Sequence, residues 1–334
     1  YINYTFFNAH IMKPKVFLTR ELPPRAMERL FEHTDLEYNK EDRVLTKEEI
    51  INGVKGKDGL LCLLTDNIDG EIMDANPNLQ IIANYAVGFN NIDVPAATSR
   101  KIPVTNTPGV LTETSADLAF TLLVSTARRV VEGDNFLRTG TWNGWGPLQY
   151  LGSDIFGATL GIIGLGRIGK AIAKRATGFD MKIIYWNRTR LTEEEEQELG
   201  LSYLPFEEVL KQSDYLSVNI AYNEHTFHLF GDKEFELMKD TSIIINTARG
   251  PVIDEKALVR ALQNKEIAGA GLDVYEDEPR VELELLEMNN CVLLPHLASA
   301  TIETRTKMGM IAIDNLLAKF SNQPLPNLVN TELL

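Results

Sequence analysis

The stretch Gly164-Leu165-Gly166-Arg167-Ile168-Gly169 is a glycine-rich turn of the G-x-G-x-x-G type. It follows the apolar run 160–163 and precedes a helix-like stretch that runs from Lys170 to Thr177. A strand that turns sharply into a helix points free backbone N–H groups and the positive helix end at one spot, which suits a pyrophosphate. The sequence therefore predicts a dinucleotide-binding βαβ unit, with cofactor contacts in this turn at Gly164, Gly166, Arg167, Ile168 and Gly169.

The second strand of this unit ends in a basic segment. After the helix, Gly178 is the expected left-handed residue, and 181–186 is typical of a strand. An acid about 20 residues beyond the glycine turn would bind a ribose 2′-hydroxyl, but the chain has Asn187-Arg188-Thr189-Arg190 there. Arginine with neighbouring hydroxyl and amide groups fits a 2′-phosphate, so we expect NADP(H) as the preferred cofactor, with NAD(H) still possible. The alternative is that Arg188 and Arg190 are ordinary solvated surface charges.

Length and composition are those of a globular protein with two domains. The 334 residues are 44% hydrophobic, enough for a sizeable core. A net charge of −14 argues against a nucleic-acid or anionic-membrane partner, and no apolar run approaches the about 20 residues that span a bilayer. Cys62 and Cys291 lie in apolar runs, which favours buried thiols in the cytoplasm. Because Met12 is followed by Lys13-Pro14-Lys15, residues 1–11 are expected to be an extension outside the fold.

The order of strands and helices indicates two wound α/β units. Short β-rich runs alternate with amphipathic segments, which is typical of parallel sheets covered by helices. In the first half, strands are expected at 16–19, 36–38, 59–64, 80–83 and 104–106, with helices at 24–33 and 47–54. In the second half, strands are expected at 160–163, 182–186, 215–219, 242–246, 269–274 and 292–294.

Two long helix-like stretches mark where the chain crosses between these units. Thr114-Ser115-Ala116-Asp117 is a capping-box pattern before a helix from Leu118 to Val131, and the second stretch runs over 301–320. We therefore expect a Rossmann NAD(P)-binding domain, residues 112–296, inserted into a flavodoxin-like substrate domain, residues 12–111 and 297–334. A ligand cleft is expected between them, at the carboxyl ends of the strands.

Three polar side chains at or beyond the ends of predicted strands are candidates for the chemistry. Arg249 follows the buried run 243–245, and its guanidinium can clamp a carboxylate with two parallel hydrogen bonds. His296 can pass a proton near neutral pH, and Glu278 beside it would orient the ring and favour its protonated form. The alternatives are a structural ion pair, a loop charge and a satisfied core histidine. The joint placement beside a dinucleotide fold favours the catalytic interpretation.

The other histidines do not indicate a metal site. The pair His225-x-x-His228 lacks the intervening glutamate of a zinc-protease helix and has no third ligand in its neighbourhood. The chain is therefore expected to bind no metal.

With these residues in hand, the chain resembles the D-isomer-specific 2-hydroxyacid dehydrogenases, most of all their glyoxylate/hydroxypyruvate reductase branch. The motifs that carry the resemblance are Tyr85-Ala86-Val87-Gly88, Asn106-Thr107-Pro108-Gly109-Val110-Leu111-Thr112, the glycine turn, Asn246 to Gly250, Gly271-Leu272-Asp273-Val274 and Pro295-His296. The resemblance implies that Arg249, Glu278 and His296 are catalytic, with His296 as the proton donor and Glu278 as its partner.

The resemblance also implies a set of binding residues. Substrate contacts are implied at Leu63, Val87, Gly88, Arg249 and His296, with the amides of Val87 and Gly88 holding the substrate carboxylate. Beyond the glycine turn, cofactor contacts are implied at Asn187, Arg188, Thr189, Ala221, Thr247, Ala248, Arg249, Asp273, His296 and Ala298. The chain departs from the family pattern at Asn90, Ala221, Pro251 and Ala298. None of these departures removes a catalytic group.

The expected activity is NADPH-dependent reduction of a small 2-oxo acid, glyoxylate to glycolate and hydroxypyruvate to D-glycerate. One alternative is another D-2-hydroxyacid dehydrogenase, such as one that oxidises phosphoglycerate. Another is a dinucleotide-sensing corepressor on the same fold, which should prefer NAD(H), so the basic segment 187–190 speaks against it. The family resemblance further implies a homodimer, with the aromatic loop Trp142 to Tyr150 as a contact that brings Trp145 to the partner's active site.

Overall fold

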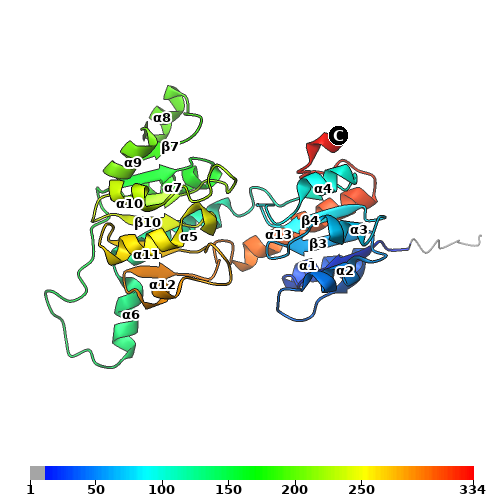
Figure 1. The fold of residues 1–334 in the computed structure, drawn as a ribbon, viewed down its shortest axis with the longest axis horizontal. Helices are drawn as coiled ribbons and strands as arrows, with labels where there is room; N and C mark the ends of the chain where they lie inside the picture. Colours follow the sequence, from blue (N-terminus) through cyan, green and yellow to red (C-terminus); the bar gives the residue numbers. More distant parts are fainter. Residues whose placement is uncertain (1–11) are drawn as a thin grey trace, which may run out of the picture. The chain divides into compact units, whose positions relative to one another are not determined.

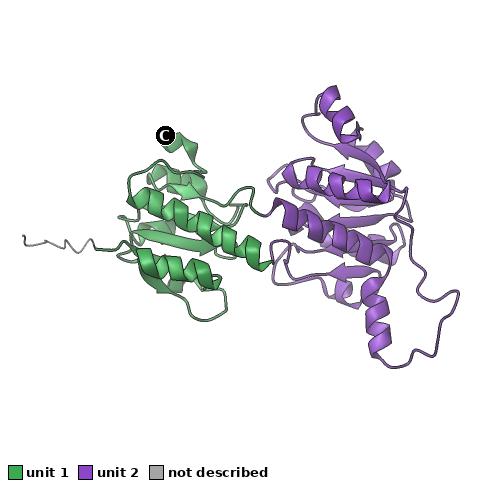
Figure 2. Cartoon of the chain, turned by 180° about the vertical axis from the view of Figure 1, so that it is seen from behind, with its two compact units in different colours: residues 1–110, 301–334 green, residues 111–300 purple. Residues whose placement is uncertain are grey.

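The computed structural model describes residues 12–334, which form two compact units (Figures 1 and 2). Unit 1 contains the chain up to Val110 and returns with Thr301–Leu334, and unit 2 is Leu111–Ala300. The expected boundaries are 111/112 and 296/297, and these two units divide at 110/111 and 300/301. The expected extension, residues 1–11, lies outside the described residues.

Unit 1 is a parallel five-stranded sheet covered by helices. Its strand order is β2-β1-β3-β4-β5, and each strand predicted for this half overlaps one of these. The strands are β1 (Lys15–Leu18), β2 (Asp35–Tyr38), β3 (Gly59–Leu63), β4 (Ile81–Tyr85) and β5 (Val104–Thr105). The α-helices are α1 (Pro24–His33), α2 (Lys47–Val54), α3 (Gly70–Asp74), α4 (Val94–Ser99) and α13 (Ile302–Phe320).

The last residues of the chain complete unit 1. Helix α13 packs on α1 and β4, and buried Asn330 binds β5, accepting the N–H of Val104 at 2.8 Å and donating to Ile102 O at 2.9 Å. These bonds pair backbone groups at the edge of the sheet, which would otherwise be left open.

Unit 2 is a parallel seven-stranded sheet with helices on both faces. Its order, β12-β11-β10-β9-β6-β7-β8, changes direction at β6, which pairs with both β7 and β9. The strands are β6 (Thr159–Ile163), β7 (Lys182–Trp186), β8 (Leu201–Tyr203), β9 (Tyr215–Val218), β10 (Ile243–Asn246), β11 (Gly269–Leu272) and β12 (Cys291–Leu293). The α-helices are α5 (Thr112–Ala127), α6 (Val130–Arg138), α7 (Arg167–Ala176), α8 (Glu193–Leu199), α9 (Phe206–Gln212), α10 (Asp232–Leu237), α11 (Glu255–Gln263) and α12 (Leu283–Glu287).

Alternate residues of these strands serve two cores. Ile162 packs with α5 and α7 on one face, whereas Ile163 packs with α9, α10 and α11 on the other. In β10, Ile243 and Ile244 divide in the same way. Burial on both faces explains why these strands are continuous apolar runs. The six strands predicted for this half all overlap observed ones, but the three-residue edge strand β8 was not expected.

Three local predictions are wrong. Helix α5 begins at Thr112, so the expected capping box at 114–117 lies inside the helix, where Asp117 binds Arg175 instead. The helix also ends at Ala127 rather than Val131, because Arg129 takes a left-handed conformation with φ 52° and a separate helix, α6, follows. After α7 a short 3₁₀ turn intervenes, so the left-handed residue is Asp180 with φ 50° and not Gly178.

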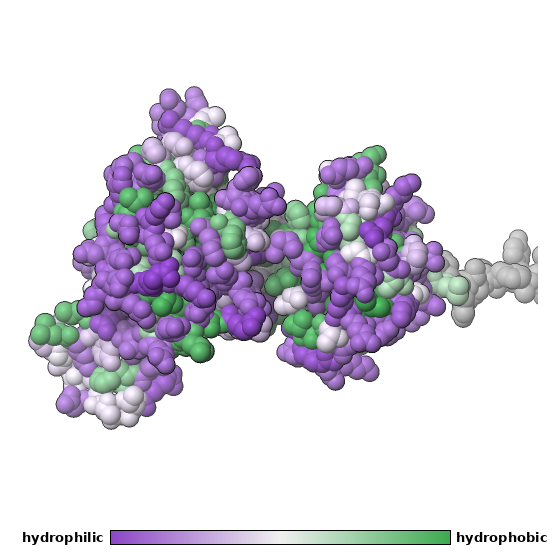
Figure 3. Space-filling view, in the orientation of Figure 1, coloured by the Kyte–Doolittle hydropathy of each residue, from purple (hydrophilic) through white to green (hydrophobic). Residues whose placement is uncertain are grey.

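Helix α6 and the segment 139–151 form an arm that stands away from the sheet of unit 2 (Figure 1). The helix has no buried residue, and Trp145 and Leu148 are 84% and 81% exposed. Hydrophobic residues are visible on this part of the surface (Figure 3). Nowhere in residues 12–334 does a helix combine the length and apolar character that a bilayer span requires.

Candidate active site

The glycine turn lies at the carboxyl end of β6, where the strand order of unit 2 reverses. Gly164 has φ 93°, and a Cβ there would lie 2.7 Å from the carbonyl oxygen of Asn219. A Cβ on Gly169 would lie 2.5 Å from the carbonyl oxygen of Gly164. Helix α7 starts directly after Gly166 and carries no acid in its first turn. The turn therefore has the close backbone packing and the positive helix end that an anionic diphosphate requires.

The end of β7 is tied to this turn. The Oδ1 atom of Asn187 accepts the N–H of Leu165 at 3.2 Å, and the carbonyl of Trp186 accepts the N–H of Gly164 at 3.0 Å. Arg188 and Thr189 are exposed just beyond. The segment predicted to meet the 2′-phosphate is thus held beside the predicted diphosphate cradle.

His296 and Glu278 form a hydrogen-bonded pair. The Nδ1 atom of His296 lies 2.9 Å from Oε2 of Glu278, and their side chains are 25% and 30% exposed. Burial raises the pKa of Glu278, but the hydrogen bond and charge of His296 outweigh it and hold that pKa below its ordinary value. Because Nδ1 is engaged, the ring keeps Nε2 for another partner, and unit 2 shows none for it among the described residues.

Asp273 binds the backbone of the two residues that follow His296. It is fully buried beyond the end of β11, and its two carboxylate oxygens accept the N–H groups of Leu297 and Ala298 at 2.6 and 2.8 Å. His296 itself has φ 55°, a left-handed conformation that needs such support. Burial raises the pKa of Asp273 in spite of these two bonds.

Arg249 follows β10 and is largely buried. Its Nη1 atom donates to the carbonyl of Ala248 at 2.7 Å. Asn246, the last residue of β10, accepts the N–H of Ala248 and donates to the carbonyl of Arg249, and so fixes the segment between them, which includes Thr247. Burial lowers the pKa of the guanidinium, and the negative charge of Glu278 acts against that shift. The three predicted catalytic side chains therefore belong to one edge of one sheet.

Val87 and Gly88 follow β4 in unit 1. The carbonyl of Ala86 accepts the N–H of Thr107 at 2.9 Å, and the carbonyl of Val87 accepts Nδ2 of Asn106 at 2.7 Å. In a trans peptide the N–H points opposite to the preceding carbonyl. The N–H groups of Val87 and Gly88 both point away from 106–107, as a pair of donors to one anion would.

Leu63 ends β3 at the same edge of the unit 1 sheet. Its N–H donates to buried Asp66 at 2.7 Å, and its carbonyl accepts Nδ2 of Asn91 at 3.0 Å. Burial raises the pKa of Asp66, whose carboxylate also accepts the Thr19 hydroxyl. The turn after β3 is therefore braced by side chains that the sequence did not single out.

Comparison with known proteins decides the family. Residues 120–298 match the family model "D-isomer specific 2-hydroxyacid dehydrogenase, NAD binding domain". The chain is 50% identical over 325 residues to a glyoxylate reductase of Korarchaeum cryptofilum, covering 97% of this chain and 98% of that protein. The chain belongs to the D-isomer-specific 2-hydroxyacid dehydrogenase family.

A solved structure and a second relative agree with this D-2-hydroxyacid dehydrogenase assignment. An NADPH-dependent glyoxylate/hydroxypyruvate reductase from Sinorhizobium meliloti, solved with NADP and malonate, is 37% identical with a TM-score of 0.83, covering 95% of this chain and 97% of that one. A glyoxylate reductase of Thermococcus litoralis is 48% identical over 327 residues, covering 97% of this chain and 98% of that protein. As a member of the family, the chain is an NAD(P)-dependent dehydrogenase.

The dehydrogenase also contains a buried acid that the sequence analysis missed. Glu255, the first residue of α11, accepts the N–H groups of Glu276 and Glu282 and so fixes both sides of the loop that carries Glu278. Burial raises its pKa. In the sequence Glu255 follows the helix cap Asp254 and is typical of a first-turn acid, which predicts an exposed residue. Its role depends on a loop more than 20 residues away, so no local pattern indicates it.

His228 belongs to the same loop arrangement. Its Nε2 atom lies 2.7 Å from Oε1 of Glu276, and its ring stacks on Phe227 with the centroids 3.9 Å apart. Among residues 12–334 no group of three or more acidic, histidine or cysteine side chains could hold a metal ion. The His225-x-x-His228 pattern thus contributes one side chain, His228, which contacts the loop that carries Glu278.

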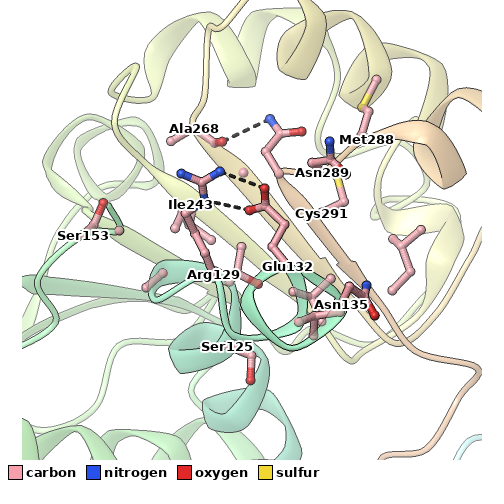
Figure 4. A pocket seen from close by; sticks show the side chains of 18 of the residues that line it. Ser125, Arg129, Glu132, Asn135, Ser153, Ile243, Ala268, Met288, Asn289 and Cys291 are labelled. Carbon is pink, nitrogen blue, oxygen red and sulfur yellow. Dashed lines mark hydrogen bonds and ion pairs between the residues drawn. The ribbon is translucent and has the colours of Figure 1, made fainter. Parts of the chain in front are cut away.

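A separate pocket of about 680 Å³ lies at the opposite edge of the unit 2 sheet (Figure 4). Its walls include Ile243, Gly269 and Cys291 at the amino ends of β10, β11 and β12, together with the Arg129–Glu132 ion pair at α6. Ligands of such sheets bind at the carboxyl ends of the strands. The pocket contains none of the predicted catalytic residues.

Proposed function

We propose that this dehydrogenase reduces glyoxylate and hydroxypyruvate, with NADPH as its preferred cofactor, and that unit 2 binds the cofactor while unit 1 contributes substrate contacts. The observation that carries the proposal is the His296–Glu278 pair, held with Arg249 at the sheet edge that also bears the glycine turn. Relatives that cover nearly the whole chain are glyoxylate reductases. A small 2-oxo acid needs what these residues offer: an anion site, a proton donor and a charge clamp.

The proposed reaction assigns each group a step. The reduced nicotinamide, when bound, supplies the hydride. The N–H groups of Val87 and Gly88 hold the substrate carboxylate, and Arg249 stabilises the negative charge that grows on the carbonyl oxygen. His296 gives that oxygen a proton from Nε2, because Nδ1 is bound to Glu278. Glu278 favours the charged imidazole before transfer, since an adjacent carboxylate stabilises it.

The proposed cofactor residues line the carboxyl ends of six neighbouring strands, β12, β11, β10, β9, β6 and β7. The cradle formed by the glycine turn, Gly164 to Gly169, would hold the diphosphate, and Asp273 the nicotinamide carboxamide through lone pairs not used by Leu297 and Ala298. Ala221, Thr247, Ala248, His296 and Ala298 complete the set at the ends of β9, β10 and β12. Arg188 and Thr189, with Asn187, would receive the 2′-phosphate, because no acid stands at the end of β7 to bind a free hydroxyl.

Steady-state turnover on a substrate panel tests this function. Glyoxylate, hydroxypyruvate, pyruvate and 3-phosphohydroxypyruvate are compared with NADPH and with NADH, and the first two with NADPH should give the highest kcat/KM. The Arg249→Lys variant should lose about 100-fold in kcat/KM, because a lysine ammonium on a flexible stem cannot reproduce the fixed N–H donors with which Arg249 stabilises the charge on the carbonyl oxygen. A folded protein that binds NADPH and reduces none of these acids would contradict the proposal.

Cofactor preference is tested separately through Arg188. An Arg188→Asp variant places an acid where NAD-dependent relatives of the fold bind the ribose, and it should reverse the preference toward NADH by about 100-fold or more. An unchanged NADPH to NADH ratio would exclude Arg188 as the 2′-phosphate ligand.

We also propose a homodimer that forms through the arm. Trp142, Trp145 and Leu148 are exposed on it, and exposed apolar side chains gathered on one projecting element are typical of an interface. Sedimentation at micromolar concentration should show a dimer for the native chain and a monomer when these three residues are replaced by serine. A monomeric native chain would contradict this part of the proposal.

The proposed location is the cytoplasm. Both cysteines are free thiols, Cys62 buried and Cys291 partly buried, which suits a reducing compartment. Fractionation of cells that express the tagged protein tests it, and recovery outside the cytoplasmic fraction would contradict it.

A further inference from the structure

The two arginines at the end of β7 are both exposed, but they differ in their partners. Arg188 forms no ion pair with any residue in 12–334. Two positions later, Arg190 binds Glu196 of α8 through Nε at 2.7 Å and through Nη2 at 2.6 Å. One edge of the Arg190 guanidinium is therefore engaged by a carboxylate. The sequence pattern presents them as equivalent, but the fold does not.

Glu196 is the centre of a small cluster that joins β7, the following loop and α8. Its side chain is only 8% exposed, and Oε1 also accepts the hydroxyl of Tyr185 at 2.6 Å. The same hydroxyl accepts the N–H of Leu191 at 3.0 Å. The Arg190 guanidinium lies 5.3 Å from the ring centre of Tyr203 in β8. The loop is thus fixed by contacts from the strand, the helix and the edge strand.

The charges of this cluster affect how strongly a nearby phosphate would bind. The hydrogen bonds from Arg190 and Tyr185 hold the pKa of Glu196 at about 2, so its carboxylate is ionised at neutral pH. A carboxylate repels a phosphate dianion, and its repulsion is reduced here because Arg190 is paired with it. The pair offers the phosphate little net charge. A direct contribution to phosphate affinity would have to come from Arg188.

We propose that Arg190 and Glu196 are positioning residues for NADPH, which hold 187–189 so that Arg188 and Thr189 meet the 2′-phosphate, and that Arg190 is not itself a phosphate ligand. This inference rests on the NADPH preference proposed above. The physical reason is preorganisation. A loop already held in its binding conformation loses less conformational entropy when the phosphate binds, and the gain applies only to the cofactor that carries the phosphate.

Substitution of Glu196 separates the two roles of Arg190 by the sign of the effect. If Arg190 is a ligand, Glu196→Gln removes a repulsive charge, frees the guanidinium and lowers the KM for NADPH. If Arg190 is a positioning residue, the loop loosens and the KM for NADPH rises about five- to tenfold. The KM for NADH and the kcat with either cofactor should stay within about twofold. A lower KM for NADPH would overturn the proposal.

The matched control is Glu194→Gln on the same helix. It removes the same charge from an exposed residue that does not contact Arg190. It should leave the KM for NADPH unchanged or slightly lower, since only long-range repulsion is lost. A rise equal to that of Glu196→Gln would show that the effect is not a property of the Arg190–Glu196 pair.

Two further variants keep the test decisive if Glu196→Gln does not fold. Tyr185→Phe retains the buried ring but removes the hydroxyl that joins Glu196 to Leu191, and it should raise the KM for NADPH about two- to threefold without changing that for NADH. Arg190→Gln should raise the KM for NADPH as much as the double variant Arg190→Gln/Glu196→Gln does, because both variants remove the same interaction, the Arg190–Glu196 pair. An unchanged KM in Tyr185→Phe, or additive effects in the double variant, would contradict the proposal.

Failure of this inference is distinguishable from failure of the proposed cofactor preference. If the native enzyme shows no preference for NADPH, or Arg188→Asp leaves the preference unchanged, the proposed function fails at the cofactor. If Arg188→Asp removes the preference while Glu196→Gln does not weaken NADPH binding, only the positioning role is wrong.

Discussion

Two histidine–glutamate pairs are attached to one loop, and they differ in the nitrogen that they use. His296 binds Glu278 through Nδ1 at 2.9 Å, whereas His228 binds Glu276 through Nε2 at 2.7 Å. Both histidines have a left-handed backbone, with φ 55° and 48°. The loop between β11 and α12 thus carries two similar hydrogen-bonded pairs, whose glutamates are only two residues apart.

The choice of nitrogen separates the proposed reactive pair from the other one. In His296 the outer nitrogen, Nε2, forms no hydrogen bond with the described residues of unit 2 and is left for the proposed substrate. His228 turns that nitrogen to Glu276, stacks on Phe227 and has its Nδ1 atom 3.9 Å from Asp254. Residue type and pairing alone therefore do not identify a proton donor. The nitrogen left available decides it.

The largest expected difference between the pairs is in turnover. His296→Asn should lower kcat by about 10²- to 10⁴-fold, because the proton donor is lost. His228→Asn should change kcat by less than about threefold and lower the free energy of unfolding by about 1 kcal/mol, since one hydrogen bond is lost. Single-turnover kinetics measure the change in turnover, and denaturant unfolding measures the change in the free energy of unfolding. Equal losses of kcat would remove the distinction.

Glu278, the partner of the proposed proton donor His296, should have the next largest effect on kcat. Glu278→Gln should lower kcat about 10- to 100-fold, because a neutral amide stabilises the charged imidazole less than a carboxylate does. Steady-state kcat measures this, with Glu276→Gln as the matched change on the other pair. A larger loss of kcat for Glu276→Gln than for Glu278→Gln would reverse the assignment.

A smaller effect is expected at the buried acid that joins the two pairs. Glu255→Gln leaves one acceptor for the N–H groups of Glu276 and Glu282, so it should lower the free energy of unfolding by about 1 to 2 kcal/mol and kcat about three- to tenfold. The exposed Glu287→Gln is the control and should change neither. A loss of stability with kcat fully retained would show that Glu255 does not position Glu278.

The smallest effect is a difference in pH dependence between Glu278 and Glu255. The pKa of Glu278 is lowered in the fold, so its contribution to stability is present above the ordinary value of 4.5 and is lost as the pH falls. The pKa of Glu255 is raised, so its contribution is present below 4.5 and is lost as the pH rises through the folded value.

Stability curves of the two glutamine variants should therefore diverge. From pH 7 to pH 4, the destabilisation caused by Glu278→Gln should shrink and that caused by Glu255→Gln should grow, each by less than about 1 kcal/mol because Glu278 is partly solvated. Urea unfolding at pH 4, 5.5 and 7 measures both. Curves that change in the same direction would contradict the opposite shifts.

Local patterns predicted the frame of the molecule well. The glycine turn, the strands and the return of the chain to unit 1 follow from apolar runs and turn residues, which act over a few neighbouring positions. Predictions at helix ends were weaker. The capping pattern at Thr114 lies inside α5, where Asp117 forms an ion pair with Arg175 of the packed helix α7.

Local sequence patterns could not predict the environment of each candidate side chain. Arg188 and Arg190 have the same side chain, but only the fold brings Glu196 to one of them. Glu255 has the pattern of an exposed first-turn acid, yet it is buried against the loop of Glu278. In both cases the deciding partner belongs to another element, and its position depends on how the elements pack.

The sequence by itself determined the class of this protein, a pair of wound parallel sheets with a dinucleotide turn and three candidate catalytic groups, because hydrophobic periodicity and turn chemistry are local properties. The tertiary structure alone decided which nitrogen of His296 is left available, which arginine is engaged by Glu196, and which acid holds the loop that carries Glu278. Those outcomes depend on hydrogen bonds between residues far apart in the chain, and such bonds exist only after the sheets and helices have packed.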